Sequence, residues 1–110
     1  MTITKTEKYT LLKPTENPVK TFHFNLLNNL VNFKGEHLII DLSEKINIDI
    51  EEIIIFLNIS TQQRENGTSF VLICNGIDID DLPDEINVVP TLTEAIDVLE
   101  MDAIERDLGF

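Results

Sequence analysis

The chain has 110 residues, enough for one domain around one hydrophobic core. Its 43% apolar and 25% charged residues are typical of a globular protein, and no apolar run reaches the roughly 18 to 20 residues that a membrane-spanning helix needs. The formal net charge of -12 opposes contact with the phosphate backbone of nucleic acids. We therefore expect a single domain over residues 1–110, with no nucleic-acid partner and no membrane partner.

The first third of the chain predicts two strands and a helix. Residues 1–6 show no clear pattern and are expected to be a flexible, frayed end. A short strand is expected over Tyr9–Leu12, and a second over Val19–Phe24, where apolar and polar residues alternate. Apolar residues at 26, 27, 30, 31 and 33 then recur at helical spacing, and Gly35 is the expected end of that helix.

Two apolar runs in the middle of the chain predict central strands. Leu38–Leu42 and Ser69–Cys74 are nearly continuous in apolar residues, as in strands that are buried on both faces of a sheet. Between them, residues 49–65 predict a helix. Asp49 followed three residues later by Glu52 has the pattern of a capping box, in which each residue satisfies a backbone N–H of the other.

The last third predicts a short helix or turn over Asp78–Leu82, a short strand over Asn87–Val89, and a closing helix. Thr91 and Glu94 form a second capping pattern at the start of that helix. Its expected apolar stripe consists of Leu92, Ala95, Ile96 and Leu99. Because strands alternate with helices, the sequence predicts an α/β domain, with a mixed central sheet of about four or five strands flanked by about three or four helices.

The segment from Leu38 to Leu57, LIIDLSEKINIDIEEIIIFL, resembles the STAS domain family, the fold of anti-sigma-factor antagonists. That family has a strand, the sequence Asp-Leu-Ser, a short loop, the pair Ile-Asp, and then Ser-Ser-Gly at the start of a helix. Asp41-Leu42-Ser43 and Ile48-Asp49 match this pattern, and PTLTEAID at residues 90–97 supports the match. The resemblance implies a STAS-like domain that acts as a non-catalytic, cytoplasmic regulatory module and binds other proteins.

The chain departs from the family at its regulatory site. In the family, a kinase phosphorylates a serine just after the Ile-Asp pair, and the phosphorylated form no longer binds its partner. A phosphate adds a charge of about -1.5 to -2 to such a surface. The matching position here is Ile50, followed by Glu51 and Glu52, and isoleucine has no hydroxyl group. The resemblance therefore implies a degenerate member that lacks the phosphoserine switch.

The expected partner-binding surface begins in the loop before this helix and continues along one helix face. Its residues are Asn47, Asp49, Ile50, Glu51, Glu52, Ile55 and Ile59. At 100° per residue, a core stripe is expected at positions 50, 53, 54 and 57, which leaves Ile55 and Ile59 on the opposite side. One interpretation is that this pair contacts an unidentified protein, such as a signalling regulator, or a second copy in a homodimer. The other is that the helix packs more broadly than a single stripe.

The acidic residues of this surface have two compatible interpretations. Asp49, Glu51 and Glu52 complement the positive end of a helix, which is worth roughly 0.3 to 1 kcal/mol each. They also offer a constitutive acidic contact to a partner. An alternative function is a small-molecule-binding or enzymatic α/β domain, with a site at the carboxyl ends of the strands, where Asp41, Ser43 and Asn75 would converge.

Other chemistry has little support in the sequence. His23 and His37 have no neighbours at metal-ligand spacing, and Pro83 stands where a calcium loop starting at Asp78 needs glycine. There is no glycine-rich phosphate loop. The single cysteine, Cys74, excludes an internal disulfide and is expected in the core of a protein from a reducing compartment. We expect no enzyme activity, no metal and no cofactor.

Overall fold

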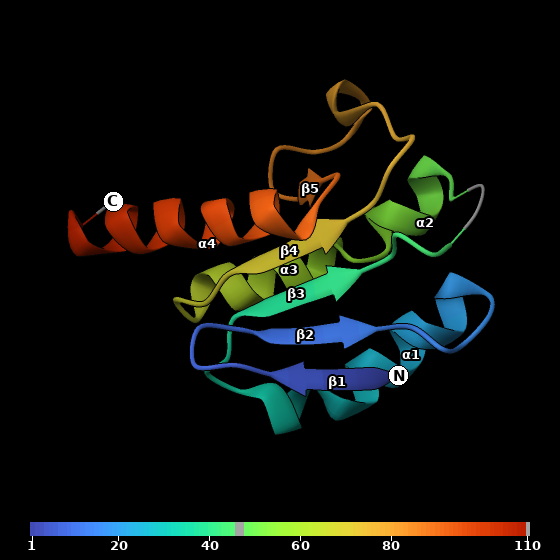
Figure 1. Ribbon diagram of the computed structural model, residues 1–110, viewed down its shortest axis with the longest axis horizontal. Helices are drawn as coiled ribbons and strands as arrows, with labels where there is room; N and C mark the ends of the chain where they lie inside the picture. Colours follow the sequence, from blue (N-terminus) through green and yellow to red (C-terminus); the bar gives the residue numbers. More distant parts are fainter. Residues whose placement is uncertain (46–47, 110) are drawn as a thin grey trace.

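In the computed structural model, which describes residues 1–45 and 48–109, five strands form one sheet in the order β1-β2-β3-β4-β5 (Figure 1). The first strand pair is antiparallel, and the other three pairs are parallel. The strands are β1 (Thr2–Lys5), β2 (Thr10–Lys13), β3 (Leu38–Asp41), β4 (Phe70–Ile73) and β5 (Asn87–Val89). This mixed sheet confirms the predicted α/β class.

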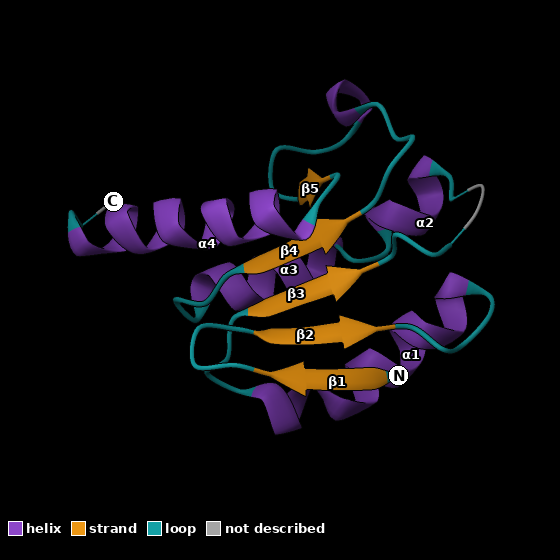
Figure 2. Ribbon diagram, in the orientation of Figure 1, coloured by secondary structure: helices purple, strands orange, loops and turns teal. Residues whose placement is uncertain are grey.

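Helices cover both faces of the sheet. α1 and α3 lie behind it, whereas α4 crosses in front of β4 and projects past the ends of the strands (Figures 1 and 2). None of the helices within the described ranges is long and apolar enough to cross a membrane. The helical segments are α1 (Val19–Asn29), η1 (Leu30–Phe33), α2 (Ile50–Ile54), α3 (Leu57–Glu65), η2 (Ile79–Asp81) and α4 (Leu92–Asp107), of which η1 and η2 are 3-10 turns.

Alternating side chains of the central strands divide the core into two clusters. Leu38 and Ile40 of β3 face the larger cluster, which α1 and α3 complete. Ile39 between them faces the smaller cluster, where Ala95 and Leu99 of α4 pack. The near-continuous apolar run predicted to be a central strand is therefore buried on both faces, as expected.

The N-terminal third differs from the prediction in two places. Residues 2–5, expected to fray, form the edge strand β1, which pairs with β2. Val19–Phe24, predicted as a strand, is the first half of helix α1. The prediction was wrong because Val19, Phe22 and Leu26, spaced three and four residues apart, are buried as a helical stripe. Over six residues, a period of two and a period of 3.6 are hard to tell apart.

Glu16 organises the turn before α1. Its Oε2 accepts a hydrogen bond from Nδ2 of Asn25 at 2.8 Å, and its Oε1 accepts one from the backbone N–H of Thr15 at 3.0 Å. The N-terminal ammonium group lies 3.3 Å from Oε1. Burial raises the pKa of Glu16, but the hydrogen bonds from Asn25, the Thr15 backbone and the N-terminal ammonium outweigh it and lower the pKa to about 2.

We expect Glu16 to make the stability of the fold sensitive to acid. A carboxyl group with a lowered pKa stabilises the folded state above its ordinary pKa of 4.5, and this contribution is lost as the pH falls toward 2. The difference in free energy of unfolding between wild type and Glu16→Gln should shrink by about 1 to 3 kcal/mol on going from about pH 5 to about pH 2.5. Urea denaturation at each pH measures it. The exposed Glu7→Gln is the control, and a Glu16 difference that stays the same at both pH values would contradict the assignment.

Candidate partner-binding surface

The connection from β3 to α2 begins with a local turn. Asp41 Oδ1 accepts hydrogen bonds from the backbone N–H of Ser43 at 2.9 Å and from its hydroxyl at 2.5 Å. Such short side-chain bonds to the backbone end strands, because they offer the chain a partner outside the sheet. Asn47, one of the predicted partner-binding residues, lies outside the described residues. Ile48 is half-buried against the larger core cluster.

Helix α2 begins with the predicted capping box, which is confirmed. Asp49 Oδ1 accepts from the backbone N–H of Glu52 at 3.0 Å, and Glu52 Oε1 accepts from the backbone N–H of Asp49 at 3.2 Å. These two bonds satisfy two of the backbone donors that a helix start leaves free. They fix the point where the chain turns into the helix, beyond the carboxyl ends of β3 and β4 (Figure 1).

Ile50 is the first residue of α2, and its side chain is half-buried. Glu51 beside it is exposed, and Glu52 is half-buried. Both carboxylates belong to the first turn, where negative charge is favourable next to free backbone N–H groups. Position 50 is therefore an apolar side chain flanked by acids, at the start of a helix that is already capped.

The predicted core and surface sides of this helix need correction. Ile54, expected in the core stripe, is 37% exposed, whereas Ile59, expected on the surface, is 0% exposed. Ile55 is half-buried against the larger core cluster. Ile59 therefore has no exposed surface to offer a partner, and Ile55 has only part of its side chain free.

The error lies in the choice of stripe, because Ile53, Phe56, Ser60 and Gln63 form the buried side of this region. The predicted single helix over residues 49–65 is two helices, α2 and α3, separated at Ile55 and Phe56. The backbone N–H of Phe56 donates to the carbonyl of Ile53, three residues back, at 3.0 Å. Phe56 is fully buried on the same side as Ile53, and Ser60 and Gln63 continue this buried side at intervals of four and three residues. Ile54 directly follows Ile53 in α2 and lies about 100° away from it around the helix, on the exposed side.

The exposed face of this region therefore consists of different residues. Asp49, Glu51, Ile54 and Asn58 are exposed, and Ile50 with Glu52 lies at the border of this face. We call Asp49, Ile50, Glu51, Glu52 and Ile54 the α2 surface. Beside it is a hollow of about 340 Å³ lined by Asn17, Val19, Glu44, Lys45, Ile48 and Glu52. The surface thus combines one exposed apolar side chain, an acidic border and a shallow neighbouring depression.

The residues of the alternative ligand site do not line this hollow. Asp41 and Ser43 hydrogen-bond to each other, and neither they nor Asn75 contribute to its wall. Cys74 is buried, as predicted, and burial raises the pKa of its thiol, with a further contribution from the negative charge of Glu52. Within the residues that the structure describes, no group of three or more histidine, cysteine, aspartate or glutamate side chains is placed to hold a metal ion.

Both histidines lie within the packed structure, apart from one another. The ring of His23 meets Phe56 edge-on, with centroids 5.1 Å apart, and burial lowers its pKa, opposed by the backbone of Ile55. His37 Nδ1 accepts a hydrogen bond from the backbone N–H of Ser69 at 3.0 Å. Burial lowers the pKa of His37 as well, and nearby Arg106 adds to that effect.

A second polar cluster, which the sequence did not predict, lies at the amino end of β4. The Ser69 hydroxyl donates to Asp102 Oδ2 at 2.7 Å and accepts from Arg106 Nη1 at 3.4 Å. These groups border a groove of about 540 Å³ between α3 and α4. Ser69 and its two partners on α4 are more than 30 residues apart, so no local pattern in the sequence could have connected them.

Comparison with known proteins shows the fold. No protein-family model and no curated protein matches this chain. Among solved structures, it resembles a chain from the structure that describes the molecular architecture of the stressosome, a signal integration and transduction hub, with a TM-score of 0.58 and 23% sequence identity. The match covers 93% of this chain and 98% of that chain. This likeness confirms the predicted STAS-like α/β fold.

Proposed function

We propose that this protein is a non-catalytic, cytoplasmic regulatory module that binds a protein partner through the α2 surface, without the phosphoserine switch of STAS domains. The observation that carries the proposal is the composition of that surface. By the resemblance to STAS domains, Ile50 stands where that family has its serine. Ile54 is exposed one turn later, after the acidic residues Glu51 and Glu52. The fold shared with a chain of the stressosome, a signal integration and transduction hub, supports a signalling role.

The chemistry of this surface indicates the kind of partner. An apolar side chain in the centre of a contact excludes water, and charged groups around it select partners by complementary charge. The α2 surface has Ile54 as its apolar centre and Asp49 with Glu51 as exposed acids. A partner with an apolar pocket bordered by lysine or arginine fits this arrangement. Because position 50 carries no hydroxyl group, such binding would be constitutive and not released by phosphorylation there.

Capture of partners from the native cytoplasm tests the proposal. We expect wild-type protein to enrich a protein that the double variant Glu51→Lys, Ile54→Asp loses, because the variant reverses one charge and removes the apolar centre. Leu92→Asp is the matched control, since Leu92 is also 37% exposed but lies at the start of α4, on the other face of the sheet. Circular dichroism checks that all three proteins are equally folded.

The control shows whether an acidic side chain at an equally exposed apolar position elsewhere is enough to lose the partner. A protein retained by wild type and Leu92→Asp, and lost by the double variant, is the expected result. Equal capture by all three proteins, or capture of nothing by wild type, would contradict a binding role for the α2 surface.

A further inference from the structure

An apolar stripe runs along the exposed side of α1 and η1. Phe24, Leu27 and Val31 are 63%, 42% and 78% exposed, although all three are large and apolar. The buried side of α1 is formed by other residues, Val19, Phe22 and Leu26. Lys20 lies four residues before Phe24, Lys34 lies three residues after Val31, and both lysines are exposed. We call Lys20, Phe24, Leu27, Val31 and Lys34 the α1 stripe.

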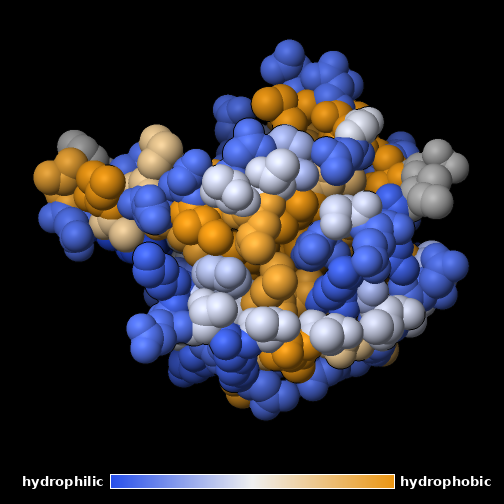
Figure 3. All heavy atoms as spheres, viewed as in Figure 1, coloured by the Kyte–Doolittle hydropathy of each residue, from blue (hydrophilic) through white to orange (hydrophobic). Residues whose placement is uncertain are grey.

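A second apolar stripe runs along α4. Met101, Ile104 and Leu108 are 62%, 58% and 65% exposed. Ala95 and Leu99, on the other side of the helix, pack against the sheet. We call Asp97, Met101, Ile104 and Leu108 the α4 stripe. Figure 3 shows hydrophobic side chains gathered at the far end of α4, where the helix projects past the sheet.

The two stripes have the same spacing. Lys20, Phe24, Leu27 and Val31 follow one another at intervals of four, three and four residues, and so do Asp97, Met101, Ile104 and Leu108. Residues at these intervals lie on one side of an α-helix, which holds for α4 and for Lys20, Phe24 and Leu27 of α1. Val31 follows in the 3-10 turn η1 and is 78% exposed, so it extends the α1 stripe beyond the end of α1. The two stripes can therefore meet along α1, with apolar side chains opposite one another at two successive levels and Val31 at the border.

The charges around the two stripes are opposite. Residues 19–34 contain two lysines and no acidic residue. Helix α4 has a single arginine, Arg106, and six carboxylates, namely Glu94, Asp97, Glu100, Asp102, Glu105 and Asp107. In a chain with a net charge of -12, a helix free of acids is the part best able to approach α4 of another molecule. The charges and the apolar side chains thus both favour contact between the α1 stripe and the α4 stripe.

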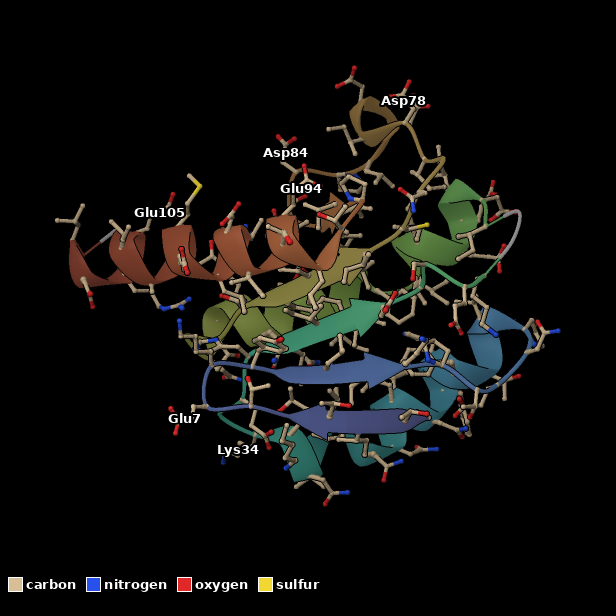
Figure 4. The ribbon with its side chains drawn as sticks, in the orientation of Figure 1. Glu7, Lys34, Asp78, Asp84, Glu94 and Glu105 are labelled. Carbon is tan, nitrogen blue, oxygen red and sulfur yellow. The ribbon has the colours of Figure 1, made fainter. Side chains whose placement is uncertain are left out.

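One copy cannot join its own stripes. α1 lies behind the sheet and α4 in front of it, with Lys34 at one edge of the molecule and Glu94 and Glu105 along α4 near the other (Figure 4). We propose that copies of this chain associate head to tail, with the α1 stripe of one copy packed on the α4 stripe of the next. A contact of this kind uses two different surfaces, so each pair of copies still has one free stripe of each kind. Further copies can add there, which builds a filament, or a ring if the free stripes meet.

The proposal makes a specific statement about charge pairs. If the two helices run parallel, their common spacing brings Lys20 of one copy to Asp97 of the next. If they run antiparallel with Val31 opposite Met101, Lys34 of one copy lies near Asp97 of the next, although Lys34 is three residues from Val31 and Asp97 is four residues from Met101. The contact does not use the α2 surface, so it is independent of the proposed partner binding. A self-assembled array would then present many copies of the α2 surface at once, and linked sites bind a multivalent partner more tightly than single ones.

Two single variants, studied alone and mixed, test the arrangement by analytical ultracentrifugation. Val31→Glu disables the α1 stripe and Ile104→Glu disables the α4 stripe, and both positions are more than half exposed. We expect wild type to form concentration-dependent species larger than a dimer, and each variant alone to stay monomeric. An equimolar mixture should form a one-to-one dimer, because one variant keeps an intact α4 stripe and the other an intact α1 stripe.

Each other outcome overturns the proposal. Wild type that stays monomeric at about millimolar concentration excludes self-association. If one variant alone still dimerises, the contact joins two identical surfaces. If the mixture stays monomeric, the stripes do not meet each other. Asn58→Glu, at an exposed position of α3, is the control and should associate like wild type. Circular dichroism confirms folding, and Phe24→Glu and Leu108→Glu replace any variant that does not fold.

A charge exchange gives an independent test. Asp97→Lys should weaken the association at low salt by about tenfold or less, as expected for an ion pair at the border of a contact. Adding Lys20→Glu in the same chain should restore it for parallel helices, and adding Lys34→Glu should restore it for antiparallel helices. Restoration by neither would overturn the assignment of the α1 stripe as the partner of α4.

Discussion

Replacement of Ile59 by alanine is expected to lower the free energy of unfolding by about 2 to 5 kcal/mol. Ile59 lies in α3 and is 0% exposed within the larger core cluster. The substitution removes three carbon atoms from a packed interior, and the surrounding side chains close the resulting cavity only in part. Urea denaturation followed by circular dichroism measures the loss.

Ile54→Ala is the matched control for this prediction. It makes the same chemical change five residues earlier, at a side chain that is 37% exposed. We expect it to cost less than about 1 kcal/mol, because surface substitutions leave no cavity. If the two variants cost the same, or if Ile54→Ala costs more, then the core side is the predicted stripe at positions 50, 53, 54 and 57.

Replacement of Phe56 by alanine is expected to cost about 3 to 5 kcal/mol. The Phe56 ring is fully buried, with its centroid 6.1 Å from that of Phe22 on α1 and 6.3 Å from that of Phe70 on β4. It therefore joins a helix and a strand at the break between α2 and α3. Aromatic pairs at these separations add to the energy of burial alone.

Phe56→Leu is the control, because leucine keeps most of the apolar volume but no aromatic ring. We expect a smaller loss for leucine than for alanine, measured in the same urea denaturation experiments. A loss below about 1 kcal/mol for Phe56→Ala would show that the three rings do not form a packed cluster.

Local features of the fold were predictable because their causes lie within a few residues. The capping box of α2 needs only Asp49 and Glu52, which are three positions apart. The Thr91 hydroxyl likewise accepts from the backbone N–H of Glu94 at the start of α4. The apolar run of β3 could be recognised as a buried strand, because its consecutive residues Leu38, Ile39 and Ile40 are apolar on both faces of the strand.

The candidate surface was predictable only in part. Its start at Asp49 and its acids at positions 51 and 52 followed from the helix signal in the sequence. Its exposed apolar residue, Ile54, did not follow, because more than one apolar side of this helix could have been the buried one. The buried side is the one that carries Phe56, whose ring packs against Phe22 and Phe70, residues 34 and 14 positions away in the chain.

The sequence alone was sufficient to establish an α/β domain with a STAS-like order of elements, the capped start of α2 and the absence of a hydroxyl group at Ile50. Tertiary packing determined that Val19–Phe24 is helical, that Ile59 is core and Ile54 is surface, and that Ser69 meets Asp102. The physical reason is the separation along the chain over which each interaction acts. Capping and periodicity act between residues within about two turns, whereas burial depends on neighbours that only the folded chain brings together.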